Sequence, residues 1–464
     1  MRAAVLEDGE LVELHMEGGE PDRQTETLYY GRVQAVRPSV HAAFVEIGQE
    51  LNAFLPLEDG VKLKSGDMLI VQGVAKQTTQ SKGLRVSTHI NLTGHTLVLI
   101  PGETGVHISK KVKNPETRAR LAEIGRTICP PDCAIIIRTA SENISAEQLQ
   151  AEAEMLLKSW QETIQRAKGM VKPGVLTKPE PLSLRLTRDL AGNLERVVIN
   201  DGDEFDALRQ AQRDGRLPPQ THIEYADEQK TLLFDAFNLE TPIDKALKKR
   251  VWLPCGGYLI FDFAEALTVI DVNSGKMVTG KSMEETALRV NLEAVKELAR
   301  QLRLRDVGGI VIVDLIDMEK DKNRQAVLAA LKDAVKSDRM PVKIEGITRL
   351  GLLEMTRKRK GEQLRRALRT TCSVCSGSGE LLCEEEIARR ALRQARRMAL
   401  AGQRGPFVVC LSEKAAKVLA AMPQPENCPP VYALASGGYR EKFSVMQPGE
   451  GEIPEQAAAL QTDK

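Results

Sequence analysis

Two apolar runs in the middle of the chain each lead into a carboxylate, and they constrain the fold more than any other feature. Residues 267–275 contain Asp271 and Asn273, and residues 308–317 contain Asp314 and Asp317. Buried parallel strands read as continuous apolar runs, and active sites collect at their carboxyl ends. The two runs therefore predict strands of one α/β layer whose carboxylates converge on one ion.

The sequence around these runs predicts how they are connected. Ser282 and Glu285 form a capping-box pattern, and an apolar stripe at helical spacing runs from Leu288 to Leu302. Strand, helix and strand make a βαβ unit with parallel strands. Further on, the pattern predicts a helix over 323–337, a strand over 342–347 and a very basic helix over 352–369 that could follow a phosphate backbone, although such charge runs are often only solvated faces.

The residues at the strand ends suit one kind of metal chemistry. Asp271 and Asn273 are two apart on a strand and share a face, and Asp314 ends the neighbouring strand. Two carboxylates with waters suit Mg²⁺, which can activate water and stabilise an in-line displacement at phosphorus. Asp317 should face the other way and cap a helix or support the ligands. The open alternative is that all these carboxylates only cap neighbouring helices.

The N-terminal part predicts a barrel and a phosphate site. Residues 25–95 alternate in short strands broken by glycine, as in a small barrel. Phe44 and Phe54 stand out in a chain with 4% aromatic residues, either as base-stacking surfaces or as core. Arg138 and Thr139 follow a strand, where an arginine with a hydroxyl can clamp a phosphate or can simply be a surface arginine.

The remaining segments are predicted from their local patterns. Ser145 and Gln148 form a capping box before a helix, residues 171–181 are typical of a linker, and residues 182–186 and 197–200 are typical of strands. In the C-terminal part, the patterns predict an Arg-rich helix near 385–400, a strand at 407–411 and a helix at 413–421.

Cys372 and Cys375 form a thiolate pair in a glycine-rich knuckle, which is half of a tetrahedral zinc site. Two further ligands could come from an identical chain or from Cys129 and Cys133 in the same chain. A redox dithiol is the other interpretation.

Composition sets the broad class. The net charge of +1 over 464 residues argues against a histone-like binder, so a polyanion would be held by local basic patches. The first 20 residues lack a signal-peptide pattern and no stretch is apolar enough for a membrane span, so we expect a cytoplasmic protein. The eight cysteines are then expected as free thiols or metal ligands.

With these residues in place, the chain resembles the ribonuclease E/G family over nearly its whole length, and most of all its shorter, ribonuclease G type. Segments 289–294, 301–306 and 351–357 read like family signatures on both sides of the predicted catalytic strands. The resemblance implies that Asp271 and Asp314 bind Mg²⁺ while Asn273 supports the attacking water. It also implies that Cys372 and Cys375 share one Zn²⁺ between two protomers of a homodimer, and leaves open whether dimers pair again.

The resemblance assigns RNA contacts as well. The barrel is expected to be an S1 domain that holds single-stranded RNA across Phe44 and Phe54, and Arg138 with Thr139 is expected to bind a 5′-monophosphate. Lys110 and Lys111 stand where the family often has paired arginines; lysine keeps the charge but loses the bidentate fork, which would weaken sensing of the 5′ end. Ser373 replaces a usual proline in the zinc knuckle, which should loosen it.

The implied fold class is α+β and multidomain. The expected domains are an RNase H-like unit split between 1–24 and 183–246, an S1-type oligonucleotide-binding barrel (25–95), a 5′-phosphate sensor region (96–182), a DNase I-like catalytic domain (247–368), a zinc link (369–382) and a small C-terminal domain (383–464).

The implied function is a Mg²⁺-dependent, single-strand-specific endoribonuclease that uses metal-activated water to leave 5′-phosphate and 3′-hydroxyl ends. It would act in rRNA maturation and mRNA decay, prefer 5′-monophosphorylated RNA, and have neither a membrane span nor a degradosome scaffold tail. The alternative is a non-catalytic RNA-binding or ribosome-assembly protein whose carboxylates are structural.

Overall fold

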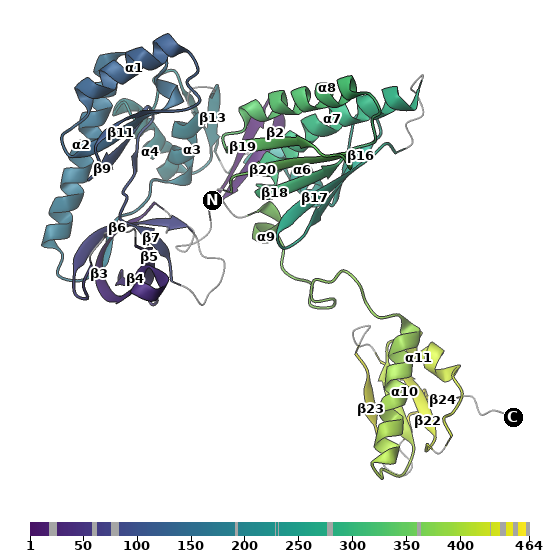
Figure 1. Cartoon of the computed structure of the whole chain (residues 1–464). Helices are drawn as coiled ribbons and strands as arrows, with labels where there is room; N and C mark the ends of the chain where they lie inside the picture. The colour runs from purple at the N-terminus through teal and green to yellow at the C-terminus, as the bar shows by residue number, and fades with distance from the viewer. Residues whose placement is uncertain are drawn as a thin grey trace. The chain divides into compact units, whose positions relative to one another are not determined.

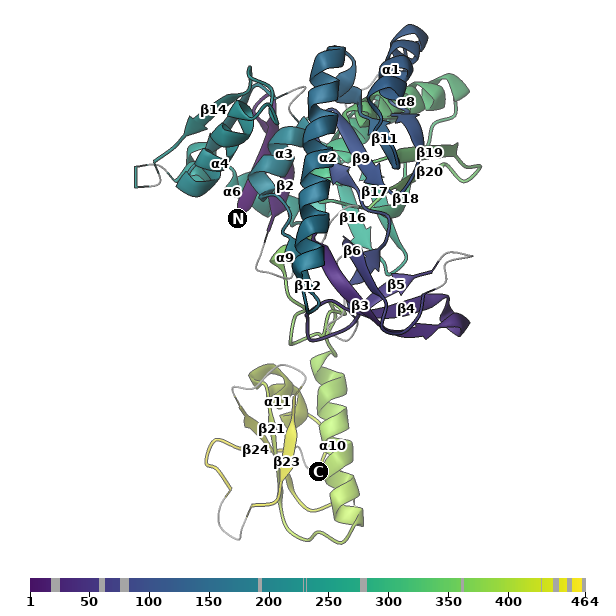
Figure 2. The same ribbon diagram turned by 90° about the vertical axis from the view of Figure 1, so that its left-hand side faces the viewer.

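The protein consists of two compact units, Met1–Ala367 and Leu368–Lys464, in the computed structural model (Figures 1 and 2). The structure describes residues 1–17, 26–57, 63–75, 83–190, 194–227, 229–230, 232–275, 282–359, 363–426, 428–436, 442–448 and 453–460. Both units mix helices and strands, so the predicted α+β class is confirmed. None of the described helices combines the length and apolar character needed to cross a membrane.

The predicted barrel is present and closed. Its strands are β3 (Leu28–Arg37), β4 (Ala42–Glu46), β5 (Ala53–Pro56), β7 (Arg85–Ser87) and β6 (Met68–Ala75), paired in that order, and β6 pairs again with β3. Its interior is filled by alternating apolar side chains such as Val33, Val45 and Leu55. A closed barrel of five strands fits the expected oligonucleotide-binding type of fold.

The segment predicted as a linker is partly a strand. β12 (Gly174–Thr177) pairs antiparallel with the start of β3, because Val175 and its neighbours provide an extended backbone beside Tyr29. The long helix α2 (Ala146–Gly169) contacts both β12 and β9 and so connects the barrel to the next sheet (Figure 2). Its predicted capping box at Ser145 and Gln148 is confirmed.

A second sheet follows the barrel. Its strand order is β10 (Gly105–Ile108), β11 (Cys133–Ile137), β9 (Leu97–Pro101) and β8 (Leu92–Thr93), with β10 and β11 parallel. The helices α1 (Pro115–Ile128) and α2 pack on it through a core that includes Leu99, Leu121 and Leu149.

Residues 182–186 form a helix, which makes the strand predicted there wrong. The alternating LSLRL pattern belongs to α3 (Leu182–Leu190), which places Leu184 in a small core with Ile199 and Leu208. That core also includes α4 (Gly202–Arg213) and the parallel pair β13 (Arg196–Ile199) and β14 (His222–Tyr225), so the strand predicted at 197–200 is confirmed. Packing on both sides of the segment overrides its strand-like alternation.

The N-terminal hairpin packs beside the predicted catalytic region. β1 (Arg2–Glu7) and β2 (Glu10–Met16) are antiparallel, and Leu11 shares a core with Leu304 and with α6 (Glu240–Ala246). A short helix, α5 (Leu233–Ala236), precedes α6.

The predicted βαβ unit forms the centre of a six-stranded mixed sheet. Its strand order is β15 (Arg250–Trp252), β16 (Tyr258–Phe263), β17 (Leu267–Asn273), β18 (Gly309–Asp314), β20 (Leu352–Arg357) and β19 (Val342–Ile347). β17 and β18 are parallel and are joined through α7 (Met283–Leu304). α7 and α8 (Asp321–Ala334) contribute to one large core with the sheet, which includes Phe261, Val290 and Val313.

The basic helix predicted over 352–369 is mostly wrong. Leu352–Arg357 forms β20, which pairs with β18 and β19 on its two sides and places Leu353 and Met355 in the core. Only α9 (Leu364–Leu368) is helical there, and the predicted basic position Lys360 lies outside the described residues.

The second unit has its own sheet and core. The strand order is β23 (Ser444–Met446), β21 (Phe407–Leu411), β22 (Val431–Ala435) and β24 (Ala458–Ala459). α10 (Glu384–Leu400) and α11 (Glu413–Ala420) pack on it. The helices and the strand predicted for this region are therefore confirmed within one residue.

Candidate active site

The two predicted metal-binding carboxylates lie side by side. Asp271 on β17 is directly opposite Asp314 on β18 in the parallel register, and neighbouring strands are about 4.8 Å apart. Asn273 is on the same face of β17, since its Nδ2 donates a hydrogen bond to Oδ2 of Asp271 at 2.6 Å. Asp271 and Asn273 are half-buried and Asp314 is exposed. Sequence reasoning therefore placed these three residues correctly relative to one another.

The donor set fits Mg²⁺ better than a transition metal. Within the described ranges, no group of three or more histidine, cysteine or acidic side chains is arranged to hold a metal. Mg²⁺ keeps several waters and commonly binds one or two protein carboxylates together with phosphate oxygens, so it needs no larger set. Asp271 and Asp314 would hold it, and the hydrogen bond from Asn273 fixes the orientation of one carboxylate.

A close backbone contact fixes the end of β17. Gly275 has a φ of +63°, and a Cβ there would lie 2.3 Å from the carbonyl oxygen of Gly256. Only glycine allows both this conformation and this approach. The segment that follows Asn273 is thereby packed against the turn between β15 and β16.

Polar side chains of α7 hold the segment after Asp314. Asn291 is fully buried, donates from Nδ2 to the carbonyl oxygen of Ile316 at 2.8 Å, and accepts from the Ile316 N–H at 3.1 Å. The Glu284 carboxylate accepts from the backbone N–H groups of Glu319 and Lys320 at 2.9 and 3.2 Å. The hydrogen bond from Glu319 is the main reason that the pKa of Glu284 lies below its ordinary value.

The role of helix cap predicted for Asp317 is wrong. α8 begins at Asp321, and the backbone N–H groups just before it are bonded by Glu284 from the neighbouring helix. Asp317 is exposed, and its carboxylate lies near Gly351: a Cβ added at Gly351 would be 3.5 Å from Oδ1 of Asp317. Sequence reasoning missed the contacts of Glu284 and Asn291, because a helix pattern does not tell which loop a polar side chain reaches.

The two phenylalanines of the barrel face outward. Phe44 and Phe54 are directly paired across β4 and β5, with ring centroids 6.1 Å apart in an edge-to-face arrangement. Both are half-buried, whereas their neighbours Ala43 and Leu55 are in the core. The alternative that both phenylalanines belong to the core is therefore wrong. Arg85, the partner of Phe54 on β7, is exposed beside them.

The predicted phosphate-binding residues come together at the ends of β10 and β11. The Oγ atoms of Ser109 and Thr139 are 3.3 Å apart, and Lys110 and Thr139 are exposed. Lys111 extends from the same turn and donates to the backbone carbonyl groups of residues 338 and 339 at 3.3 Å.

Arg138 is partly committed to neighbours within the protein. Its guanidinium donates to the carbonyl oxygen of Gly94 at 2.6 Å and to Asp189 at 2.9 Å. Arg138 is half-buried, which differs from the free surface arginine that the sequence allowed. The two contacts hold the guanidinium at Gly94 and Asp189, whereas the Thr139 hydroxyl lies against Ser109.

The cysteine pair in the second unit forms a tight knuckle. Backbone N–H groups of Gly379 and Gly377 point at the Cys375 thiol and lower its pKa, and Ser376 and Gly377 have positive φ values of 49° and 90°. Such a loop favours the thiolate, which is the form that binds metals. Cys372 is exposed beside it, so the knuckle presents two thiol groups, half the number of ligands that a tetrahedral zinc site requires.

Cys129 and Cys133 show the opposite behaviour. Burial raises the pKa of both thiols, and the Cys129 thiol donates to the carbonyl oxygen of Cys133 at 3.3 Å. Protonated thiols of this kind are typical of structural cysteines rather than of metal ligands.

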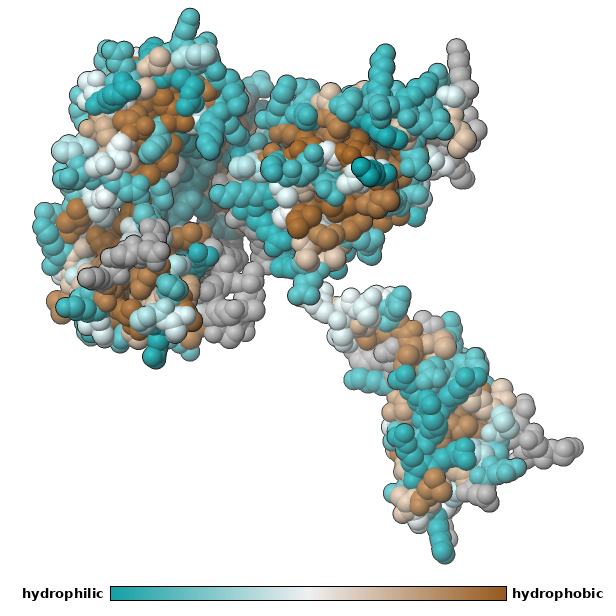
Figure 3. Space-filling model, in the orientation of Figure 1, coloured by the Kyte–Doolittle hydropathy of each residue, from teal (hydrophilic) through white to brown (hydrophobic). Residues whose placement is uncertain are grey.

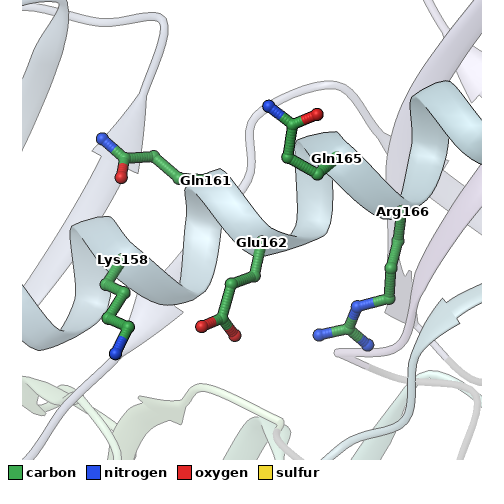
Figure 4. Close-up of a pocket in the computed structure, with 5 residues that line it drawn as sticks. All are labelled: Lys158, Gln161, Glu162, Gln165 and Arg166. Carbon is green, nitrogen blue, oxygen red and sulfur yellow. The ribbon is translucent and has the colours of Figure 1, made fainter.

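An open hollow of about 760 Å³ lies along α2 (Figure 4). Its lining consists of Lys158, Gln161, Glu162, Gln165 and Arg166. All five come from one helix, and Arg166 already donates to the carbonyl oxygen of Leu176. The hollow therefore lacks the convergent groups of different elements that a catalytic site needs.

Comparison with known proteins gives consistent matches. The model of the ribonuclease E/G family matches residues 91–360, which include the carboxylate pair. Ribonuclease G of Haemophilus influenzae is 36% identical over 442 residues, covering 90% of this chain and 89% of that protein. Ribonuclease G of Escherichia coli is 32% identical over 440 residues, covering 90% of each chain. Ribonuclease E of a Nostoc species is 34% identical over 394 residues, covering 81% of this chain and 57% of that protein.

Proposed function

The chain belongs to the ribonuclease E/G family, and from this premise we propose that it is a Mg²⁺-dependent endoribonuclease specific for single strands. As a member of the family it is a hydrolase that acts on RNA phosphodiester bonds. The finer proposal depends above all on one observation, the direct opposition of Asp271 and Asp314 on parallel strands with Asn273 bonded to the first.

The residues divide the chemistry between them. Asp271 and Asp314 would hold the ion, and Mg²⁺ when bound would stabilise negative charge on the scissile phosphate and activate a water. The Asn273 amide uses Nδ2 on Asp271, which leaves its carbonyl oxygen to accept a hydrogen bond from the attacking water. The water oxygen forms the new bond to phosphorus while the bond to the 3′ oxygen breaks. The products carry a 5′-phosphate and a 3′-hydroxyl.

The barrel holds the single-stranded substrate in this proposal. Phe44 and Phe54 give an outward aromatic surface, and the exposed Arg85 supplies a positive charge for the backbone. Unpaired bases can stack on aromatic rings regardless of sequence, whereas bases within a duplex are already stacked. The same surface therefore accounts for a preference for single strands.

The ends of β10 and β11 bind the 5′-monophosphate of the substrate. Lys110 and Thr139 are exposed at this point, and the half-buried Arg138 precedes Thr139 in the chain, with its guanidinium bonded to Gly94 and Asp189. Because two N–H groups of Arg138 already donate to Gly94 and Asp189, only its remaining N–H groups can donate to the phosphate. Lys110 therefore provides most of the positive charge that is free to bind it. A modest preference for 5′-monophosphorylated RNA follows.

The decisive test compares matched oligonucleotides with a 5′-monophosphate or a 5′-hydroxyl, incubated with Mg²⁺ and then with EDTA. We expect cleavage of both with Mg²⁺, faster for the monophosphate, and none with EDTA. Asp271→Asn and Asp314→Asn should each lower kcat by about 10³ or more, since metal stabilisation supplies several kcal/mol to such transition states. Unchanged cleavage by the variant that combines Asp271→Asn and Asp314→Asn would rule out the metal mechanism.

We further propose that Cys372 and Cys375 share one Zn²⁺ with the same pair of a second copy, which gives a homodimer. The knuckle supplies two thiolate ligands, and a tetrahedral structural site needs four. Metal analysis beside a sedimentation mass tests this: half a zinc per chain in a dimer is expected. One zinc per chain in a monomer would instead favour a site within one chain. We place the enzyme in the cytoplasm, in rRNA maturation and mRNA decay.

A further inference from the structure

The catalytic sheet has one face in the core and one face toward solvent. Side chains such as Leu259 and Val272 pack under α7, and the residues that alternate with them point the other way. We call this second side the open face. Its exposed apolar residues include Trp252 (63% exposed), Ile310 (47%) and Val269 (38%). Figure 3 shows hydrophobic residues on the surface where Figure 1 draws β16, β17 and β18.

The catalytic residues stand on this open face in two rows across the strands. In one row Trp252 is paired with Tyr258, which is paired with Asn273. In the neighbouring row Arg250 is paired with Ile260, and Ile260 is paired with Asp271. Asp271 is in turn paired with Asp314. The aromatic residues are thus in register with the active site, two strands away from it at most.

The aromatic end of these rows is organised as a binding surface. The rings of Trp252 and Tyr258 meet edge to face, with centroids 5.2 Å apart and planes at 64°. The Arg250 guanidinium lies 4.5 Å from the centre of the Tyr258 ring and 5.6 Å from that of Trp252. Both Trp252 and Arg250 are exposed, so an indole face and a positive charge are presented to solvent together.

We propose that Arg250, Trp252 and Tyr258 form a subsite that stacks an unpaired RNA base beside the scissile phosphate. This inference rests on the proposed ribonuclease function. Aromatic rings next to an arginine are the means by which proteins bind single-stranded nucleic acid without reading its sequence. Two strand spacings separate Trp252 from Asn273, about 10 Å in all, so the base belongs to a nucleotide close to the cleaved bond.

The position of the subsite favours RNA over a second copy of the chain as its occupant. The row of Trp252 and Tyr258 continues into Asn273, and the neighbouring row of Arg250 continues through Ile260 into Asp271 and Asp314 on the same face. A protein covering Trp252 broadly enough to form a stable interface would also close these carboxylates to substrate. An extended strand of RNA, in contrast, contacts the aromatic rings and the carboxylates at once, and its phosphates suit the charge of Arg250.

Fluorescence of the subsite itself provides a readout independent of cleavage. The chain has two tryptophans, Trp160 and Trp252, so the Trp160→Phe variant reports on Trp252 alone. Titration with a short single-stranded RNA, without added Mg²⁺, should quench this emission with the same midpoint as the anisotropy of the labelled RNA. A duplex should quench little. Unchanged emission while the single strand binds would overturn the inference.

Substitution then measures what the subsite contributes. Trp252→Ala should raise both Kd and KM about fivefold or more, the range seen for base stacking on aromatic side chains, and leave kcat within about twofold. Trp252→Phe should recover most of the affinity. Ile310→Ala, an exposed apolar change on the same face but outside the two rows, is the control and should leave Kd unchanged.

The remaining outcomes separate the inference from the function that it depends on. Cleavage by wild type with no effect of Trp252→Ala on Kd or KM would overturn the subsite alone. A loss of sedimentation mass in Trp252→Ala without an effect on RNA binding would assign the surface to a second copy instead. Failure of the wild type to bind or cleave any single strand would overturn the proposed function and the subsite together.

Discussion

Replacing Asn291 by alanine removes the amide that holds the segment just after Asp314. The side chain is fully buried and makes two hydrogen bonds to the backbone of Ile316, at 2.8 and 3.1 Å. Each backbone group left without its partner in a buried position costs about 1–3 kcal/mol. Because Ile316 is half-buried and water can satisfy part of the loss, we expect Asn291→Ala to lower the free energy of unfolding by about 2–3 kcal/mol.

Urea denaturation followed by circular dichroism measures this loss, and single-turnover cleavage measures its effect on the site. Since Asp314 is two residues from Ile316, we expect kcat to fall on the order of tenfold or more, because misplacing a catalytic group by about 1 Å can lower the rate about 10²-fold. Lys296→Ala, an exposed change on the same helix, should stay within about 0.5 kcal/mol of wild type. If Asn291→Ala matched that control in both stability and kcat, the hydrogen bonds between Asn291 and Ile316 would have no role in folding or catalysis.

Three further changes test other parts of the structure. Burial raises the pKa of Glu13, but its hydrogen bond with His15 and the charge of Arg339 outweigh this and hold the pKa far below the ordinary 4.5. The ion pairs of Glu13 thus add stability that is present above pH 4.5 and is lost as the pH falls toward the folded-state pKa. Glu13→Gln should lower the free energy of unfolding by about 3 kcal/mol at pH 7 and reduce the loss of stability that follows as the pH falls below 4.5. If the variant lost stability in acid as steeply as wild type, that loss would come from other carboxylates. Gly275→Ala should lower the Tm in thermal melts more than Gly9→Ala does, because both glycines have a positive φ but only a Cβ at position 275 would lie 2.3 Å from a carbonyl oxygen. Equal decreases in Tm would mean that the positive φ alone accounts for both and that the close contact at Gly275 has no effect. Lys110→Ala should reduce the slope of log Kd against log salt by about 1, and Lys111→Ala by less, because the Lys111 amino group already bonds two backbone carbonyls; the reverse order would place the phosphate at Lys111.

Local periodicity predicted the parts of the site that depend on one or two neighbouring strands. Asp271 and Asn273 share a face because side chains alternate along any strand. Asp314 joins them because the connecting helix makes the two strands parallel, so that both end at the same edge of the sheet. The same reasoning failed for residues 352–357. The sequence predicts them as the start of a basic helix that extends to Arg369, whereas pairing with β18 and β19 on both sides, a long-range effect, makes them a strand.

The aromatic residues show a second limit of the sequence. Phe44, Phe54 and Trp252 are equally apolar, and nothing in their local pattern tells the outside of a barrel or sheet from its inside. The structure separates them by register: Phe44 alternates with buried Ala43 and Val45, and Trp252 with buried Leu253. Their exposure is therefore a property of the assembled sheets, which is why the subsite at Trp252 had no signal in the sequence.

The carboxylates alone do not account for the geometry of the site, because the loops around them must also be held. One helix, α7, holds two loops through three polar side chains. In the loop between β18 and α8, Glu284 bonds residues 319 and 320 and Asn291 bonds Ile316. In the loop between β15 and β16, Glu293 accepts from the Cys255 N–H at 2.8 Å. An uninterrupted apolar stripe would bind this helix to the sheet more simply. The polar residues that interrupt it cost desolvation and are retained where backbone groups need partners. Polar residues within an otherwise apolar helix face are thus the positions where a sequence indicates which helix supports an active site.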